Sequence, residues 1–321
     1  MDLYPRMTLT KAMFITMRPY LLFVSGITGL AGMAVAGPVP TAVVIPVFLA
    51  SFFSYGFGQV LTDCFQTDTD ALSAPYRPLT YGAVKRSSMM VVAVAGLLLC
   101  SAVFALRNPL NGVLGAIAVL GLATYTPFKR RWWGGPFYNG WIVLVLALIG
   151  YFAATGPANG SLPPSAFPVF AAVLFGYANF VLAGYFKDIS ADAATGYNTL
   201  PVVFGRRVAA LTSDGLAGLT VLAFLAAAVL SGDPRAIGIP MIPAALFGAA
   251  GIVTTIRGQI LLHRNTEDGL AHIPIGFVVQ SYILLLSAIV ALHQPDWSFF
   301  LVLHFLVYCI VFARRPEATQ I

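Results

Sequence analysis

The sequence predicts an all-α, polytopic integral membrane protein. Of its 321 residues, 59% are hydrophobic and only 9% are charged, whereas a soluble domain of this length carries about 25% charged residues. Apolar stretches of about 20 residues, the length that crosses a bilayer as a helix, recur along the whole chain. No soluble domain or long linker interrupts them, so we expect residues 1–321 to form a single transmembrane domain.

Ten apolar segments are candidates for these spans. The last is short for a span and either crosses the membrane or lies in its interface, so we expect nine to ten transmembrane helices. The segments are residues 19–36, 40–62, 87–106, 109–127, 136–154, 166–187, 207–231, 237–262, 272–293 and 297–313.

The basic residues orient these segments. With the N-terminus in the cytoplasm, sixteen of the eighteen Lys and Arg residues lie on the cytoplasmic side, and only Arg107 and Arg235 lie outside. This asymmetry follows the positive-inside rule. It also explains the net charge of +6 without an acidic partner, and the chain has no nucleic-acid-binding signature. Arg314 and Arg315 lie inside only if the last segment crosses, which favours ten spans.

Acidic residues gather at two cytoplasmic span ends. Asp63, Asp68 and Asp70 follow the second apolar segment, and Asp188 and Asp192 follow the sixth. The i, i+4 spacing of the second pair places both carboxylates on one face of a helix. Like charges in this arrangement repel each other unless a cation lies between them. A ring of helices would bring the two clusters face to face.

The residues around the clusters suit a metal and a phosphate. Gln66 shares an i, i+3, i+7 face with Asp63 and Asp70 if the helix continues through them. Mg²⁺ prefers oxygen ligands and is commonly held by one or two carboxylates together with substrate phosphates. Basic side chains of the kind that bind a diphosphate also lie nearby, namely Arg77, Lys129, Arg130, Lys187 and Arg206. The clusters therefore predict a site for Mg²⁺ and a diphosphate.

The motifs resemble those of the UbiA superfamily of intramembrane prenyltransferases. The family's N-D-x-x-D-x-x-x-D motif with its R-P-L/I turn is similar to TDCFQTDTD and the following YRPL. The family's second motif, D-x-x-x-D and then T-L-P-x-x-x-G, looks like Asp188 to Asp192 followed by TLPVVFG. YTPFK (125–129) and Arg18-Pro19 resemble two further family signatures, and all of these motifs occur in the family's order.

The resemblance implies a helical bundle around a central cavity that opens towards the cytoplasm. Mg²⁺ ions held by the two motifs would bind an isoprenyl diphosphate, which ionises to an allylic carbocation that a lipophilic acceptor attacks. The expected catalytic and metal-binding residues are Asp63, Asp70, Asp188 and Asp192, with Asp68 as a further metal ligand. The expected substrate-binding residues are Thr62, Gln66, Arg77, Tyr125, Lys129, Asn179 and Lys187.

The first motif departs from the family at two positions. Thr62 stands where the family has Asn, and Gln66 stands where it has the middle Asp. A Gln amide oxygen ligates a metal without charge, so metal binding is expected to be weaker. Three interpretations remain open: a metal site shifted onto Asp68, a site weighted to the second motif, or altered chemistry. The short spacing from Asp70 to Arg77 is similar to that of the chlorophyll-synthase and archaeal glycerolipid branches.

The leading hypothesis is a Mg²⁺-dependent prenyltransferase in the cell membrane, with a prenyl diphosphate donor and a lipophilic acceptor. A UbiA-type terpene cyclase would use the same ionisation, but the prenyl chain would trap its own cation. A non-catalytic lipid-binding relative is the third alternative, suggested by Gln66. Formation of a product from a prenyl diphosphate without acceptor distinguishes the first two.

Overall fold

The computed structural model describes residues 7–157, 161–231 and 241–315, and these residues form helices joined by turns, with no strand among them. Nine helices of this part of the chain are long and apolar enough to cross a membrane, and a bent pair is a possible tenth span. The prediction of nine to ten spans in an integral membrane protein is thus confirmed. The nine contain α3 (Thr41–Asp63), α5 (Arg86–Arg107), α6 (Pro109–Lys129), α7 (Gly135–Thr155), α8 (Ala166–Gly184), α10 (Leu200–Ser231), α11 (Ile242–His263), α12 (His272–His293) and α13 (Ser298–Ala313).

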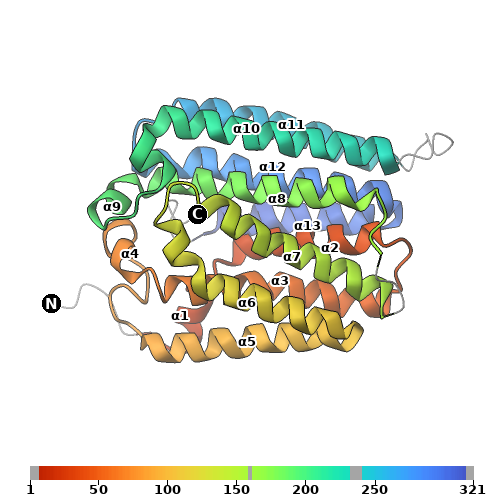
Figure 1. Ribbon diagram of the computed structural model, residues 1–321, viewed down its shortest axis with the longest axis horizontal. Coiled ribbons are helices and arrows are strands. Elements are labelled where there is room, and N and C mark those ends of the chain that lie inside the picture. Colours follow the sequence, from red (N-terminus) through yellow and green to blue (C-terminus); the bar gives the residue numbers. More distant parts are fainter. Residues whose placement is uncertain (1–6, 158–160, 232–240, 316–321) are drawn as a thin grey trace.

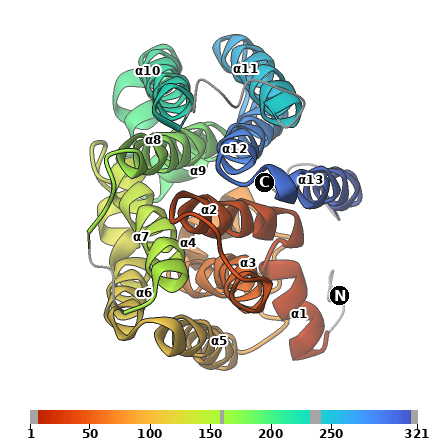
Figure 2. The same cartoon turned by 90° about the vertical axis from the view of Figure 1, so that its right-hand side faces the viewer.

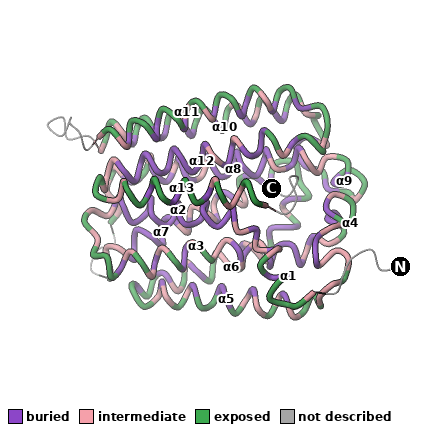
Figure 3. The backbone as a smooth tube through the Cα atoms, turned by 180° about the vertical axis from the view of Figure 1, so that it is seen from behind, coloured by how far each residue is buried: buried purple, intermediate pink, exposed green. Residues whose placement is uncertain are grey.

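The long helices run side by side, as a bundle with its short helices at one end (Figure 1). The bent pair is formed by α1 (Leu9–Thr16) and by the 3₁₀ turn Pro19–Leu21 with α2 (Leu22–Val35), at an angle of 45°. Seen end-on, α10 and α11 lie at one edge and α5 at the opposite edge (Figure 2). Most of α8 and α12 is buried, whereas α5, α10 and α11 are largely exposed (Figure 3).

Small residues bring two central helices into backbone contact. A Cβ atom on Gly32 of α2 would overlap the carbonyl oxygen of Ala147 of α7, and one on Gly150 would overlap that of Gly29. Helices in membranes associate through such small residues because the surrounding lipid supplies no hydrophobic driving force between them.

The side chain of Asn108 fixes the turn between α5 and α6. Asn108 caps α6 by accepting a hydrogen bond from the Leu110 N–H, and Pro109 follows at the first helical position, where its missing N–H costs nothing. The Asn108 amide also donates to the carbonyl oxygens of Phe152 and Gly156 at the end of α7. The α5–α6 turn is therefore tied to α7.

The bend between α1 and α2 is centred on a strained residue. Arg18 has φ 51° and ψ 73° and is the one non-glycine residue with positive φ in the described ranges. The left-handed region is unfavourable for a side chain with a Cβ, and a following proline restricts the backbone further. Such strain persists where the surrounding structure compensates for it.

One predicted segment begins at a different residue in the structure, and some predicted positions lie outside the part of the chain that the structure describes. The seventh segment begins at Leu200, not near residue 207, because helical geometry continues on both sides of a break at Gly205, which has φ 80°. Arg6, Arg235 and residues 237–240, which the predicted topology uses, lie outside the described residues.

Candidate functional site

The first acidic motif does not form one continuous helix. Helix α3 ends at Asp63, Cys64 and Phe65 make a turn, and α4 (Thr67–Ser73) begins a new helix. The predicted i, i+3, i+7 face is therefore wrong. The break nevertheless turns Asp63, Gln66 and Asp70 towards one common cavity.

This cavity, which we call the polar chamber, has a volume of about 650 Å³. Four basic and three acidic side chains line it: Arg18, Arg77, Lys129 and Lys187 with Asp63, Asp70 and Asp188. Thr62, Gln66, Tyr125 and Tyr185 are also in its wall. It thus contains most of the residues that the sequence predicts for the site.

Asp63 is held by three neighbours. One Nη atom of Arg18 lies 3.2 and 3.1 Å from its two carboxylate oxygens, and Gln59 donates to it at 2.6 Å. Arg77 is 4.0 Å away. All four side chains come from the helix bend, α3 and the loop after α4, so the strained backbone of Arg18 serves to aim its guanidinium at this carboxylate.

Asp70 forms the shortest of these ion pairs. Its Oδ1 lies 2.6 Å from Nη1 of Arg77, and both side chains are buried. Burial raises the pKa of Asp70, and Arg77 opposes this shift. Burial by itself would lower the pKa of Arg77, but Asp70 and Asp63 outweigh it and raise that pKa. The two side chains therefore form a buried salt bridge in which Arg77 remains protonated.

Lys129 links the first motif to the second. Its Nζ donates to Oε1 of Gln66 at 3.1 Å and lies 3.6 Å from Asp192. Asp192 is fully buried and accepts hydrogen bonds from Thr69 and Thr199. Burial raises its pKa to about 6, with Lys129 opposing the shift. Gln66, the departure from the family motif, is thus satisfied by a lysine.

Asp188 differs from the other carboxylates of the chamber. It precedes α9 (Ile189–Ala194), and its Oδ1 is buried and has no hydrogen-bond partner within the described residues. Burial by itself would raise its pKa, but the cations Lys187, Lys129 and Arg77 lower it. Asp188 is therefore an ionised carboxylate in the chamber wall, and one of its oxygens accepts no hydrogen bond from the described residues.

Three predicted residues lie outside the wall of the polar chamber. Asp68 is on the surface of α4, where it pairs with Arg130 at 2.9 Å and accepts a hydrogen bond from Tyr197. Asn179 points away from the chamber and accepts a hydrogen bond from Ser213 at 2.5 Å. Asp192 is also outside the chamber wall, since it is covered by Lys129. In the described ranges no three acidic, His or Cys side chains stand ready as a metal site, so the structure does not gather the five predicted metal ligands.

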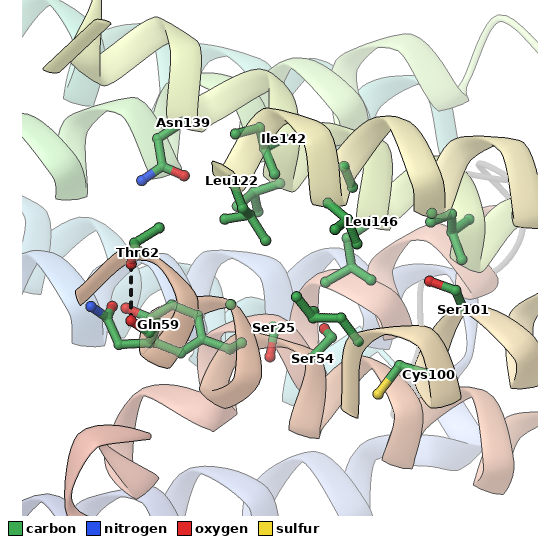
Figure 4. A pocket seen from close by; sticks show the side chains of 18 of the residues that line it. Ser25, Ser54, Gln59, Thr62, Cys100, Ser101, Leu122, Asn139, Ile142 and Leu146 are labelled. Atoms are coloured by element: carbon green, nitrogen blue, oxygen red, sulfur yellow. Dashed lines mark hydrogen bonds between the residues drawn. The ribbon is translucent and has the colours of Figure 1, made fainter. Parts of the chain in front are cut away.

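A second, apolar chamber of about 740 Å³ adjoins the first (Figure 4). Five side chains line both chambers: Tyr55, Gln59, Thr62, Asn139 and Tyr177. From Asn139 the apolar chamber follows α7 to Ile149, ten residues or about 15 Å of helix. Most of its other lining residues come from α3, α5 and α6. Leu122 of α6 and Leu146 of α7 face the space.

Sequence reasoning overlooked Gln59 and Asn139. Both are polar residues inside apolar spans, and this alone was a usable signal, because such residues usually face a cavity or a partner. Gln59 lies one turn before Asp63 and both donates to it and lines the two chambers. The signal was weak because single amide side chains also serve to bond helices together.

The sequence is similar to that of known proteins. Residues 23–268 match the model of the UbiA prenyltransferase family. The digeranylgeranylglyceryl phosphate synthase of Thermococcus kodakarensis is 31% identical over 216 residues, 66% of this chain and 76% of that protein. The chloroplastic chlorophyll synthase of Oryza sativa is 28% identical over 192 residues, 56% of this chain and 50% of that protein.

Solved structures share the fold. A UbiA homolog from Aeropyrum pernix superposes with a TM-score of 0.67 at 21% identity, covering 87% of this chain and 97% of that one. A UbiA homolog from Archaeoglobus fulgidus, bound to GPP and Mg²⁺, gives a TM-score of 0.64 at 17% identity, covering 87% and 99%.

Proposed function

Because the chain belongs to the UbiA prenyltransferase family, we propose that its two chambers hold the two halves of an isoprenyl diphosphate. The observation that carries this proposal is the wall shared by a polar chamber, lined by four basic side chains, and an apolar one. A prenyl diphosphate has the same division into a charged head and a hydrocarbon chain. The protein thus acts as a membrane prenyltransferase with a prenyl diphosphate donor and a lipophilic acceptor.

The polar chamber suits the diphosphate head. Arg18, Arg77, Lys129 and Lys187 present cations from different elements, and two of them are arginines, which bind phosphate oxygens in a bidentate way. Arg77 is paired with Asp70 in the structure. Binding of a diphosphate gives Arg77 a further anionic partner beside Asp70 and Asp63, so it bridges substrate and carboxylates.

The same chamber offers ligands for Mg²⁺ that the oxygens of a bound diphosphate would complete, since within the described residues its carboxylates do not form a metal site by themselves. Three carboxylates and the amide oxygen of Gln66 line it, and the buried, unpartnered Oδ1 of Asp188 is a ligand atom available without breaking an ion pair. When bound, Mg²⁺ stabilises the negative charge that develops on the leaving diphosphate. Asp63, Asp70 and Asp188 would hold it, and Asp192 would act through Lys129.

The chemistry is ionisation followed by capture. The allylic C–O bond breaks, its electron pair leaves with the diphosphate, and the acceptor then bonds to the carbocation and loses its proton. The cations of the chamber favour this step because their attraction grows as charge develops on the leaving group. The ring faces of Tyr55 and Tyr177, at the junction of the chambers, would stabilise the carbocation.

The test uses the purified protein and radiolabelled geranyl, farnesyl and geranylgeranyl diphosphates, each with and without a membrane lipid extract. We expect a prenylated lipid only when extract and Mg²⁺ are both present, and no product in excess EDTA. A hydrocarbon or alcohol formed at equal rate without extract would instead establish the cyclase alternative. Binding of donor without any turnover would establish a non-catalytic lipid-binding protein.

We further propose that the polar chamber faces the cytoplasm. The sixteen-to-two distribution of basic residues supports this orientation. The short helices α4 and α9, which carry the acidic motifs, lie together at one end of the bundle (Figure 1). Both motifs therefore lie on the same side of the membrane as the chamber.

A further inference from the structure

A groove lies between α10 and α11, outside the two chambers. The open space within and above this groove is about 1030 Å³. These two helices form the outer edge of the bundle (Figure 2), so the groove is on the surface that contacts lipid. The lining residues that matter here are Asp214, Gly218, Leu222, Ile252, Gln259 and His263.

Small residues on α10 keep the groove open. A Cβ atom on Gly218 would meet no other atom within 4 Å, so space remains beside it. The apolar side chains of Leu222, Ile256 and Ile260 border this space and are exposed. In a bilayer their surroundings are hydrocarbon chains.

The floor of the groove contains an unsatisfied polar group. Gln259 is 91% buried, since its exposed fraction is 9%, and its Nε2 has no hydrogen-bond partner in the described part of the chain. Ser213 lies 2.5 Å from Oδ1 of Asn179 and 3.0 Å from Oε1 of Gln259. Because Oε1 of Gln259 is turned towards Ser213, the atom left without a partner is the Nε2 donor. Gln259 lines the groove, and a donor buried there without a partner is costly in a membrane.

The mouth of the groove is polar and basic. Nε2 of His263 lies 2.6 Å from Oδ2 of Asp214, and both side chains are more than one-third exposed. The exposed Arg264 follows at the end of α11. From Asp214 to Leu222 the groove follows eight residues of α10, about 12 Å. It therefore descends from the headgroup level into the hydrocarbon.

We propose that this groove binds one glycerophospholipid of the leaflet on that side. One acyl chain lies along Leu222 and Ile252, and an oxygen of the glycerol linkage accepts a hydrogen bond from Gln259. The phosphate lies at the level of His263 and Arg264, where basic side chains attract anionic headgroups. From the hydrocarbon outwards, the groups of such a lipid come in the order acyl chain, linkage oxygen and phosphate. The groove presents apolar side chains, then Gln259, then His263 in the same order.

The experiment uses the full-length protein in nanodiscs that contain phosphatidylglycerol with a photoreactive diazirine in one acyl chain. After irradiation, labelled peptides are mapped by mass spectrometry. We expect labelling concentrated in residues 214–222 and 252–263. Gly218→Leu, which fills the groove, should reduce it about tenfold, the change that loss of one modest set of contacts produces.

The matched control is Gly215→Leu. Gly215 lies on the same helix, also has open space beside it, and does not line the groove, so labelling should remain at the wild-type level. Prenyl transfer is measured in both variants to show that they fold. Equal labelling in Gly218→Leu and wild type, or labelling spread evenly over all lipid-facing helices, would overturn the proposal. So would displacement of the label by a long-chain prenyl alcohol but not by unlabelled phosphatidylglycerol.

Discussion

The polar and the apolar chamber share a wall but are built from different parts of the helices. The polar chamber is made by helix ends and bends, such as Arg18 at a break and Asp188 before α9. The apolar chamber is made by the middle turns of regular helices, for example Leu122 and Leu146. Irregular backbone points many charged groups at one place, whereas regular helices give a smooth wall.

The difference is also one of electrostatics. In the polar chamber Arg18, Arg77 and Lys129 are each paired with a carboxylate before substrate arrives. Removing one partner of a buried pair costs about 3–5 kcal/mol. The apolar chamber has no such interdependence, and changes in it should alter the fit of the chain rather than the chemistry. Four predictions test this contrast.

The largest expected effect is all-or-none and concerns which side of the membrane the polar chamber faces. In a variant without native cysteines, a cysteine at the exposed Ser190 marks the chamber end and one at the exposed Pro157 marks the other end. An impermeant maleimide should label position 157 in intact cells and position 190 only after permeabilisation. The reverse pattern would place the chamber on the outside.

The next effect separates two aspartates of α4. Asp70→Asn should slow consumption of the prenyl diphosphate at least about 100-fold, as loss of one transition-state electrostatic contact does. Asp68→Asn should stay near the wild-type rate, because Asp68 is on the surface and outside the chamber. An equally large loss in Asp68→Asn would show that the surface carboxylate is a metal ligand after all.

A smaller effect is expected in the apolar chamber. Ala118 lines it, and Ala118→Phe should lower kcat/KM for geranylgeranyl diphosphate about tenfold relative to geranyl diphosphate, since room for two or so methylene groups is lost. Ala116→Phe, on the exposed face of the same helix, is the control and should leave this ratio unchanged. A uniform loss with both donors would indicate that the chain does not occupy this chamber.

The smallest effect concerns Gln66. Gln66→Asp restores the family's carboxylate and should lower the Mg²⁺ concentration for half-maximal activity several-fold, whereas Gln66→Leu should raise it. The titration is followed with the prenyl diphosphate in excess. An unchanged Mg²⁺ requirement in Gln66→Asp would mean that this side chain serves only Lys129, with which it is hydrogen-bonded.

The spans could be predicted because hydropathy is a local property. The site could be predicted only in part, because its geometry depends on where helices stop. The sequence places Asp63 and Asp70 two turns apart on one helix, but the chain breaks at Cys64 and lets Asp70 pair with Arg77. The break brings Asp63 and Asp70 to Arg77. The periodicity of the sequence cannot predict this, because it depends on contacts between residues that are far apart in the chain or in different elements.

Asn179 shows the same limit. It is among the substrate-binding residues that the sequence predicts, yet it faces α10 and accepts a hydrogen bond from Ser213. The face that a helix turns inward depends on all its neighbours. Short polar side chains carry too little free energy to decide it alone.

The bend at Arg18 has an evolutionary consequence. Loss of Asp63 would leave a strained backbone that holds an uncompensated buried cation, and loss of Arg18 would leave Asp63 without the guanidinium that contacts both its oxygens. A substitution at either position alone is therefore unfavourable. The two residues, 45 positions apart, should therefore be inherited as a unit, and relatives that lack one should lack the other.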